Sequence, residues 1–193
     1  MTSAEPNGMP RSGDGSLRAE TGRVGTTSAK VVYRWLKAPS DIDAALSDQL
    51  ATCWWEVSNA GGAVGFPFLP VGKDDVEVAV GRLIGSLDPE VRILLVAVSD
   101  EVLRGWLLLE RNSNPLTAHW ARVVRLQTAL GARGSGIGHA LMSEAARAAR
   151  DDLGLVHLHI EVRRRSGARG LLRVMRLARD RTLARGSPVG SGG

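Results

Sequence analysis

The chain has 193 residues, a length that supports one globular domain and is short of two ordinary ones. Its longest apolar run, Ile93–Val98, is far below the ~18 residues of a membrane span, and the first residues lack the apolar stretch of a secretory signal. The single cysteine, Cys53, excludes an internal disulfide and fits a reducing compartment. We therefore expect a cytoplasmic, single-domain protein that has no membrane partner.

The positive charge of the chain is concentrated at one end. The formal net charge is +5, but residues 163–193 contain nine arginines and one acid, Asp180, so this segment alone carries +8. Residues 1–162 consequently carry −3. Any argument for binding nucleic acid through a basic surface thus applies to the last 31 residues and not to the body of the chain.

The first elements can be placed from composition and periodicity. Residues 1–29 are rich in Gly, Ser, Thr and Pro and predict a disordered leader. Residues 31–36 alternate as a strand, and Ser40 or Asp41 can cap a helix that runs to about Ser58.

The rest of the chain alternates between helices and strands. A second helix is expected over 74–86, strands over 92–99, 102–111 and 119–128, a third helix over 136–152 and a strand over 156–162. This order predicts an α/β (α+β) domain, here given the bounds 30–162, built on a mixed sheet.

A glycine-rich turn between the strand over 119–128 and the third helix carries the clearest chemical signal. It reads Arg133-Gly-Ser-Gly-Ile-Gly138, and glycines followed by a helix N-terminus make a concave set of N–H groups that suits a phosphate. A dinucleotide-binding pattern fails because residue 139 is His, and a P-loop fails because Ile137 follows Gly136. A turn built only for close helix–strand packing is the competing interpretation.

The R-x-x-G-x-G spacing, together with the order of elements, resembles the GNAT superfamily of N-acetyltransferases over residues 31–162. The resemblance implies a mostly antiparallel central sheet flanked by helices, acetyl-CoA as cosubstrate without a metal, and a small-molecule or peptide amine as acceptor. It implies that Leu126 and Thr128 offer backbone groups to the pantetheine arm. It also implies that the pyrophosphate is wrapped by Arg133, Gly134, Ser135, Gly136, Ile137, Gly138 and His139.

Catalytic residues are not assigned by the sequence. Glu110 and His119 are the nearest candidates for a general base, although each also fits a solvated strand end. The only tyrosine, Tyr33, is far from the motif, whereas related enzymes often use a tyrosine as general acid. Trp54 and Trp55 are candidates for the acceptor pocket, with Trp54 also fitting the core.

His157 and His159 share one face of a predicted strand, a spacing that can bind a metal ion. The sequence offers no evident third ligand, so we expect them to be structural.

The segment 163–193 departs from the family pattern. Its Leu171, Val174, Met175 and Ala178 can form a helical stripe, so we expect a disordered or partly helical tail and the loss of the family's C-terminal strands. The lost strands would expose a sheet edge, which favours a homodimer. The alternative function is binding of nucleic acid or an acidic partner through this tail, which the absence of tail aromatics disfavours.

The genetic code suggests an origin for this tail. Synonymous codons for Leu171–Pro188 exist that, read one base later, encode Phe-Tyr-Glu-Ser-Cys-Gly-Trp, the kind of segment that the family carries after its fifth strand. We hypothesise a frameshift near Arg163–Arg165 that replaced the natural C-terminal third.

Overall fold

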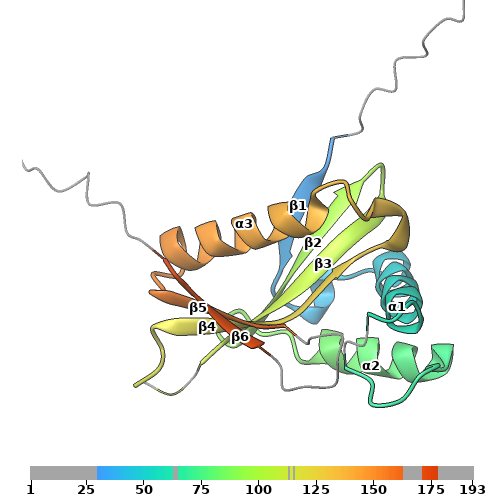
Figure 1. Cartoon of the computed structure of the whole chain (residues 1–193), viewed down its shortest axis with the longest axis horizontal. Helices are drawn as coiled ribbons and strands as arrows, with labels where there is room; N and C mark the ends of the chain where they lie inside the picture. Colours follow the sequence, from blue (N-terminus) through green and yellow to red (C-terminus); the bar gives the residue numbers. More distant parts are fainter. Residues whose placement is uncertain (1–29, 63–64, 113, 115, 163–170, 178–193) are drawn as a thin grey trace, which may run out of the picture.

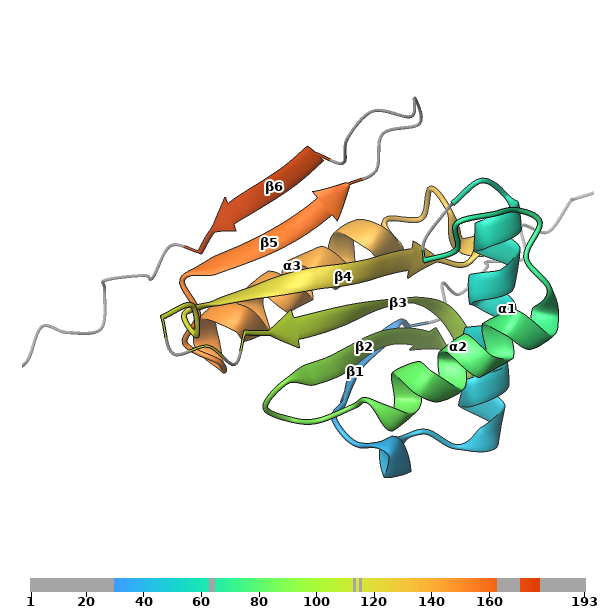
Figure 2. The same cartoon turned by 90° about the horizontal axis from the view of Figure 1, so that it is seen from below.

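The computed structural model describes residues 30–62, 65–112, 114, 116–162 and 171–177. A six-stranded sheet runs through it in the order β1-β2-β3-β4-β5-β6, and all neighbouring strands are antiparallel except β4 and β5 (Figures 1 and 2). The strands are β1 (Val32–Leu36), β2 (Arg92–Ser99), β3 (Val102–Arg111), β4 (Trp120–Thr128), β5 (His157–Val162) and β6 (Leu171–Arg176). This confirms the predicted mixed, mostly antiparallel sheet.

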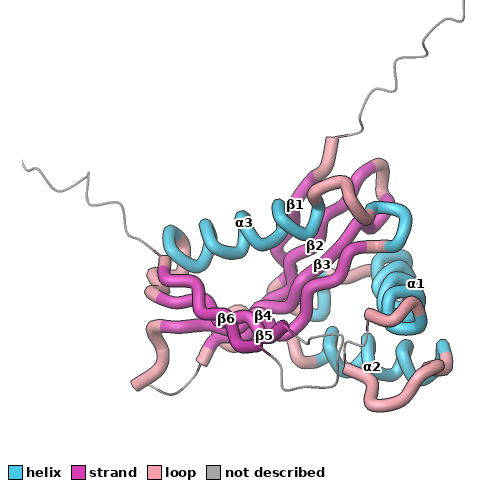
Figure 3. The backbone as a smooth tube through the Cα atoms, viewed as in Figure 1, coloured by secondary structure: helices cyan, strands magenta, loops and turns pink. Residues whose placement is uncertain are grey.

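Helices cover both faces of the sheet. Helices α1 (Ala44–Asn59) and α2 (Lys73–Gly85) lie on one face and α3 (Ile137–Asp151) lies on the other (Figure 3). Side chains of β2 alternate between the two cores because successive residues of a strand point to opposite faces: Leu94 and Val96 pack toward α1 and α2, whereas Leu95 packs toward α3. No described helix combines the length and the apolar character needed to cross a membrane.

The start of α1 corrects one prediction. Neither Ser40 nor Asp41 caps the helix, since Pro39–Asp41 forms a separate 3₁₀ turn in which the Asp41 carboxylate accepts a 2.7 Å hydrogen bond from the Lys37 N–H. Asp43 is the cap, and its Oδ1 accepts a 2.8 Å hydrogen bond from the Leu46 N–H.

Strands β4 and β5 separate part of the way along. Only Trp120–Val123 of β4 pairs with β5, although β4 continues to Thr128 (Figure 2). The pairing with β3 has its irregularity at the same place, because Leu108 pairs with Arg125 and Leu109 with Val123, leaving Val124 as an extra residue. The second half of β4 therefore has one edge that β5 does not cover.

The C-terminal segment corrects a second prediction. Two predictions, a partly helical tail and the loss of the C-terminal strands, are wrong for residues 171–176. These residues form β6 and pair with all of β5. The free edge of β5 explains the difference, since its unpaired N–H and C=O groups gain partners from a strand. Leu177 follows, 7% exposed in the core beside α3, and its N–H donates to the Val156 carbonyl at 2.9 Å.

The remaining predictions for the two ends of the chain lie outside the described residues. These are the leader over 1–29 and the rest of the tail, 163–170 and 178–193. The disorder expected there stays a prediction.

Candidate functional site

The turn between β4 and α3 is open to solvent. Residues Leu130–Ala132 form a 3₁₀ turn, and Gly134 and Gly136 then adopt positive φ angles of 79° and 83°. A methyl group added at either glycine would meet no atom within 4 Å. Packing therefore does not explain these two glycines, whereas the left-handed backbone does.

The N-terminus of α3 faces the same open space. The first hydrogen bond into the helix runs from the Ala140 N–H to the Gly136 carbonyl, at 3.0 Å. Among the described residues no acceptor is found for the N–H groups of the three preceding residues, Ile137, Gly138 and His139. Free N–H groups and the positive end of the helix dipole together suit an anion.

The uncovered edge of β4 supplies a second set of backbone groups. The Ala129 N–H donates to the Arg104 carbonyl at 3.0 Å, and residues of an antiparallel strand alternate in the direction of their hydrogen bonds. Gln127 therefore also faces β3, and the backbone groups of Leu126 and Thr128 point to the open side. All nine residues predicted to contact the cofactor thus lie along the second half of β4, the turn that follows it and the start of α3.

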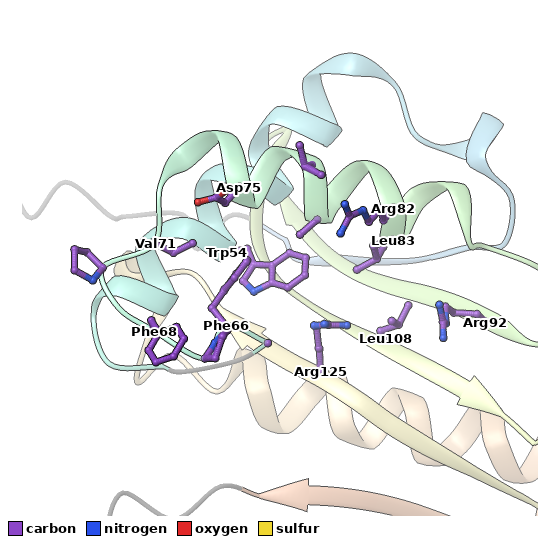
Figure 4. A pocket seen from close by; sticks show the side chains of 15 residues that line it. Trp54, Phe66, Phe68, Val71, Asp75, Arg82, Leu83, Arg92, Leu108 and Arg125 are labelled. Carbon is purple, nitrogen blue, oxygen red and sulfur yellow. The ribbon is translucent and has the colours of Figure 1, made fainter.

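A cavity of about 710 Å³ lies on the other face of β4, between the sheet and helices α1 and α2 (Figure 4). Its apolar wall includes Trp54, which is 2% exposed and packs 5.4 Å from the Phe66 ring, and also Phe68 from the same loop. Its charged lining residues are Asp75, Arg82, Arg92 and Arg125.

The loop that forms one wall of this cavity is fastened to α1. Val71 donates its N–H to the Asn59 Oδ1 at 2.9 Å, and its carbonyl accepts from the Asn59 Nδ2 at 3.2 Å and from the Trp55 Nε1 at 3.1 Å. Trp55 is 36% exposed, and it does not line the cavity itself but supports the loop through this hydrogen bond. Trp54 is buried, as expected for a core residue, and it also lines the cavity; its role in an acceptor pocket stays a prediction.

Arg125 occupies the centre of the cavity floor (Figure 4). Its guanidinium carbon lies 4.6 Å from the centre of the Trp54 ring, a cation–π contact, and a methyl group added at Gly65 would lie 3.0 Å from its Nη2. Burial lowers the pKa of Arg125, and the charge of Arg92 lowers it further.

Neither candidate base is among the described residues that line the cavity, although Glu110 binds Arg92, which does. Glu110 is 16% exposed in its side chain and is held by Arg92 and by Arg122, the latter at 2.7 Å. Burial raises the pKa of Glu110, but the hydrogen bonds from Arg122 and Arg92 outweigh it, so the pKa is below its ordinary value. A carboxylate engaged by two guanidinium groups is an ion-pair centre and a poor base.

His119 precedes β4 at the end remote from the glycine turn. With a rise of about 3.3 Å per residue, the length of β4 places His119 roughly 25 Å from the start of that turn. Its ring lies 6.1 Å from that of His157, and His159 stacks on Trp120 at 4.4 Å. Burial, followed by the charges of His157 and Arg122, lowers the pKa of His159. These aromatic contacts agree with the structural role expected for the two strand histidines.

The other reactive side chains are placed as follows. Tyr33 lies in β1, with β2 and β3 between it and β4, so it does not reach the site as a general acid. Cys53 is buried in α1, and burial raises the pKa of its thiol to about 11. Within the described part of the chain no three His, Cys, Asp or Glu side chains form a group suited to a metal ion.

Sequence reasoning missed the charged half of the cavity. Arg92 and Arg125 stand in strands that read as core elements, and the segment 65–70 reads only as an irregular loop. The single available signal is that an arginine interrupts the apolar run of β4 at 125.

Comparisons with known proteins agree on one family. Residues 33–175 match the profile described as "Acetyltransferase (GNAT) family", which extends beyond the resemblance seen in the sequence and includes most of β6. A search of curated protein sequences gave no match.

Solved structures share the fold at low identity. A protein of the GNAT family from Desulfovibrio desulfuricans is 20% identical with a TM-score of 0.50, covering 72% of this chain and 78% of its own. Ribosomal-protein-alanine N-acetyltransferase from Brucella melitensis is 16% identical with a TM-score of 0.52, covering 70% and 82%. An aminoglycoside 6'-acetyltransferase of type Ii is 15% identical with a TM-score of 0.50, covering 68% and 71%.

Proposed function

The chain belongs to the GNAT acetyltransferase family, and from that premise we propose that it transfers an acetyl group from acetyl-CoA to a primary amine. The observation that supports this most strongly is the continuity of the open glycine turn with the uncovered edge of β4. One feature suits a pyrophosphate, and the other suits an extended amide-bearing arm.

The cofactor-binding residues follow from that arrangement. The N–H groups of Ile137, Gly138 and His139 would hold the pyrophosphate, with the backbone of Gly134 and Gly136 beside them. Ser135, whose N–H donates to the Ala132 carbonyl at 3.4 Å, would lie against it, and the exposed Arg133 would add a positive charge. The backbone groups of Leu126 and Thr128 would pair with the pantetheine arm as a further strand would. When bound, acetyl-CoA supplies a thioester whose acetyl group passes to the amine while the CoA thiol is released.

The chain would contribute orientation and charge stabilisation to this transfer. A free N–H on the open edge of β4 would donate to the carbonyl oxygen as negative charge develops on it. The acceptor amine would enter from the cavity between the sheet and helices α1 and α2. That cavity and the uncovered edge both involve the second half of β4, so the amine and the thioester would meet across this one strand. No general base or acid is assigned.

The similar structures include enzymes named for acceptors as different as an aminoglycoside and a ribosomal protein. At these identities they indicate the fold and not the acceptor. A small-molecule or peptide amine therefore remains the proposed class. The alternative, binding of nucleic acid through the arginine-rich tail, is less well supported because residues 171–176 of that tail are used as a strand of the sheet.

Calorimetric titration of the purified chain with acetyl-CoA and with CoA tests the proposal. We expect micromolar binding that Gly136→Asp weakens by at least about tenfold, because the substitution puts a negative charge and a strained φ of 83° at the phosphate site. Gly81→Asp is the matched control, since it adds the same charge at an open position on α2. A folded wild-type chain that binds neither ligand would contradict the proposal.

A further inference from the structure

The cavity beside β4 is electropositive. Arg82, Arg92 and Arg125 line it against one carboxylate, Asp75. An excess of cationic side chains in a partly enclosed, low-dielectric site attracts anions and repels cations more strongly than the same charges would in open solvent.

The three arginines differ in how far the protein neutralises them. Arg92 donates to Glu110, and its Nη1 donates to the Ser86 Oγ at 2.9 Å. Arg82 is exposed on α2 at the rim. For Arg125, no carboxylate lies within 4.0 Å among the residues that the structure describes, and its Nε is buried without a hydrogen-bond partner.

The guanidinium of Arg125 is fixed in position and can bind an anion. The Trp54 ring lies against its guanidinium at 4.6 Å, and the space between Gly65 and the guanidinium is small enough that a methyl group at Gly65 would lie 3.0 Å from Nη2. A half-buried cation with no carboxylate in direct contact costs free energy that a ligand oxyanion can recover, and Glu110 acts on Arg125 only as a charge at longer range. A guanidinium fixed by stacking also loses little conformational entropy when it binds one.

We propose that the acceptor of this protein is an amine that also carries an oxyanion, a carboxylate or a phosphate, which binds to Arg125 on the floor of the cavity with Arg92 and Arg82 nearby. The inference rests on the proposed acetyl transfer, because it names the substrate class of that site. Trp54, Phe66 and Leu108 line the same cavity, so the acceptor also presents an apolar body to this wall.

The same arrangement disfavours polycations. A ligand with several ammonium groups would face Arg125 and two further arginines, with Asp75 as the one carboxylate among the described residues that line the cavity. The chain thus differs in expected acceptor from the aminoglycoside acetyltransferase that shares its fold.

The test compares ligands that differ only in the anion, by calorimetry and by thermal shift in the presence of CoA. One pair is 4-(aminomethyl)benzoate and 4-(aminomethyl)benzamide, and a second pair is phosphoethanolamine and ethanolamine, so the two arms separate a carboxylate from a phosphate. An aminoglycoside serves as the polycation. We expect the anionic member of at least one pair to bind about tenfold or more tightly than its neutral partner.

Two substitutions locate the effect. Arg125→Gln should abolish the preference for the anionic member, and Arg125→Lys should restore part of it, because the charge returns without the planar fork. Arg34→Gln is the control, since it removes an exposed arginine of β1 that does not line the cavity. Circular dichroism and acetyl-CoA binding establish that each variant is folded.

The outcomes separate this inference from the proposed function. Equal binding within both pairs, or tighter binding of the aminoglycoside, overturns the inference even if acetyl-CoA binds normally. A preference for the anion that survives Arg125→Gln also overturns it. A preference that Arg125→Gln abolishes supports the anion site. If the wild-type chain shows this preference and does not bind acetyl-CoA, the proposed acetyl transfer is contradicted and the anion site is not.

Discussion

Glu110 shows how one side chain can look catalytic in the sequence and act structurally in the fold. It lies opposite Arg92 of β2 and opposite Arg122 of β4, because the two registers place all three residues in one row across the sheet. Cross-strand neighbours of opposite charge stabilise a sheet. With only 16% of its side chain exposed, Glu110 is better shielded from solvent screening than a surface ion pair.

This row makes a prediction about pH. The folded pKa of Glu110 lies below its ordinary value, so its contribution to stability is present above the unfolded pKa and is lost as pH falls through the folded one. Glu110→Gln should lower the free energy of unfolding by about 1–2 kcal/mol at pH 7 and by much less near pH 3. Urea denaturation at the two pH values measures the difference.

Glu90→Gln provides the control for this measurement. Glu90 pairs with Arg111 at 3.1 Å, but its side chain is 80% exposed, so we expect a change within about 0.5 kcal/mol at either pH. An equal loss for both variants would mean that the row across β2, β3 and β4 adds nothing beyond an ordinary surface pair.

At the scale of elements, the closest packing of helix on sheet occurs at Gly105, outside the glycine motif. A methyl group added at Gly105 of β3 would lie 2.8 Å from the Gln127 carbonyl oxygen and 3.0 Å from Cγ2 of Ile137 in α3. Within the motif, a methyl group would meet nothing at Gly134 and Gly136, and at Gly138 it would lie 3.3 Å from the Thr128 Oγ1. The competing interpretation of the motif as a packing turn thus fits Gly138 in part and does not fit Gly134 or Gly136.

Gly105→Ala should destabilise the fold by about 1–3 kcal/mol, because β3 must move away from both the Gln127 carbonyl of β4 and helix α3 to admit the methyl group. Gly81→Ala in α2 makes the same change where no atom lies within 4 Å, and helix propensity should stabilise it by about 0.5–1 kcal/mol. Chemical denaturation of both variants distinguishes the two sites. A neutral Gly105→Ala would show that the helix tolerates a wider separation than the structure has.

The periodicity of apolar residues predicts most helices and strands correctly. It fails where contacts between distant parts of the chain determine the local structure. The spacing of Leu46, Leu50 and Trp54 predicts α1, and all three are buried in the structure. The cap was misplaced because Asp41 and Asp43 are both competent acceptors, and only the 3₁₀ turn before the helix selects Asp43. Residues 171–176 lack the alternation of a strand and fit a helical stripe, yet they form a strand because they pair with the free edge of β5.

One part of the candidate site could be predicted from the sequence and the other part could not. The glycine turn is local in sequence, so its residues could be named before the fold was known. The contact of Arg125 with Trp54 joins β4 to α1 across 71 positions and exists only because the sheet packs on that helix. No spacing in the sequence encodes such a pair, and the charge of the cavity could not be predicted from it.

For the whole molecule, the C-terminal segment is both atypical and part of the fold. Strand β6 pairs along the full length of β5, and Leu177 extends the core beside α3. The frameshift hypothesis stays a prediction, and the coding DNA decides it, since codons incompatible with the Phe-Tyr frame would reject it. In its present frame the segment already covers an edge of β5 that would otherwise be exposed.

Shortening the chain tests how much the fold depends on this cover. A chain of residues 1–162 lacks β6 and Leu177, so the edge of β5 and the apolar surface under Leu177 become exposed, and we expect a lower melting temperature together with concentration-dependent association. A chain of residues 1–177 retains both features and should melt near the full-length protein. Within that chain, Leu177→Ala should cost about 2–4 kcal/mol, because a buried leucine is replaced by a cavity. Light scattering and thermal unfolding report both effects, and equal behaviour of the two shortened chains would mean that β6 adds no stability to the sheet.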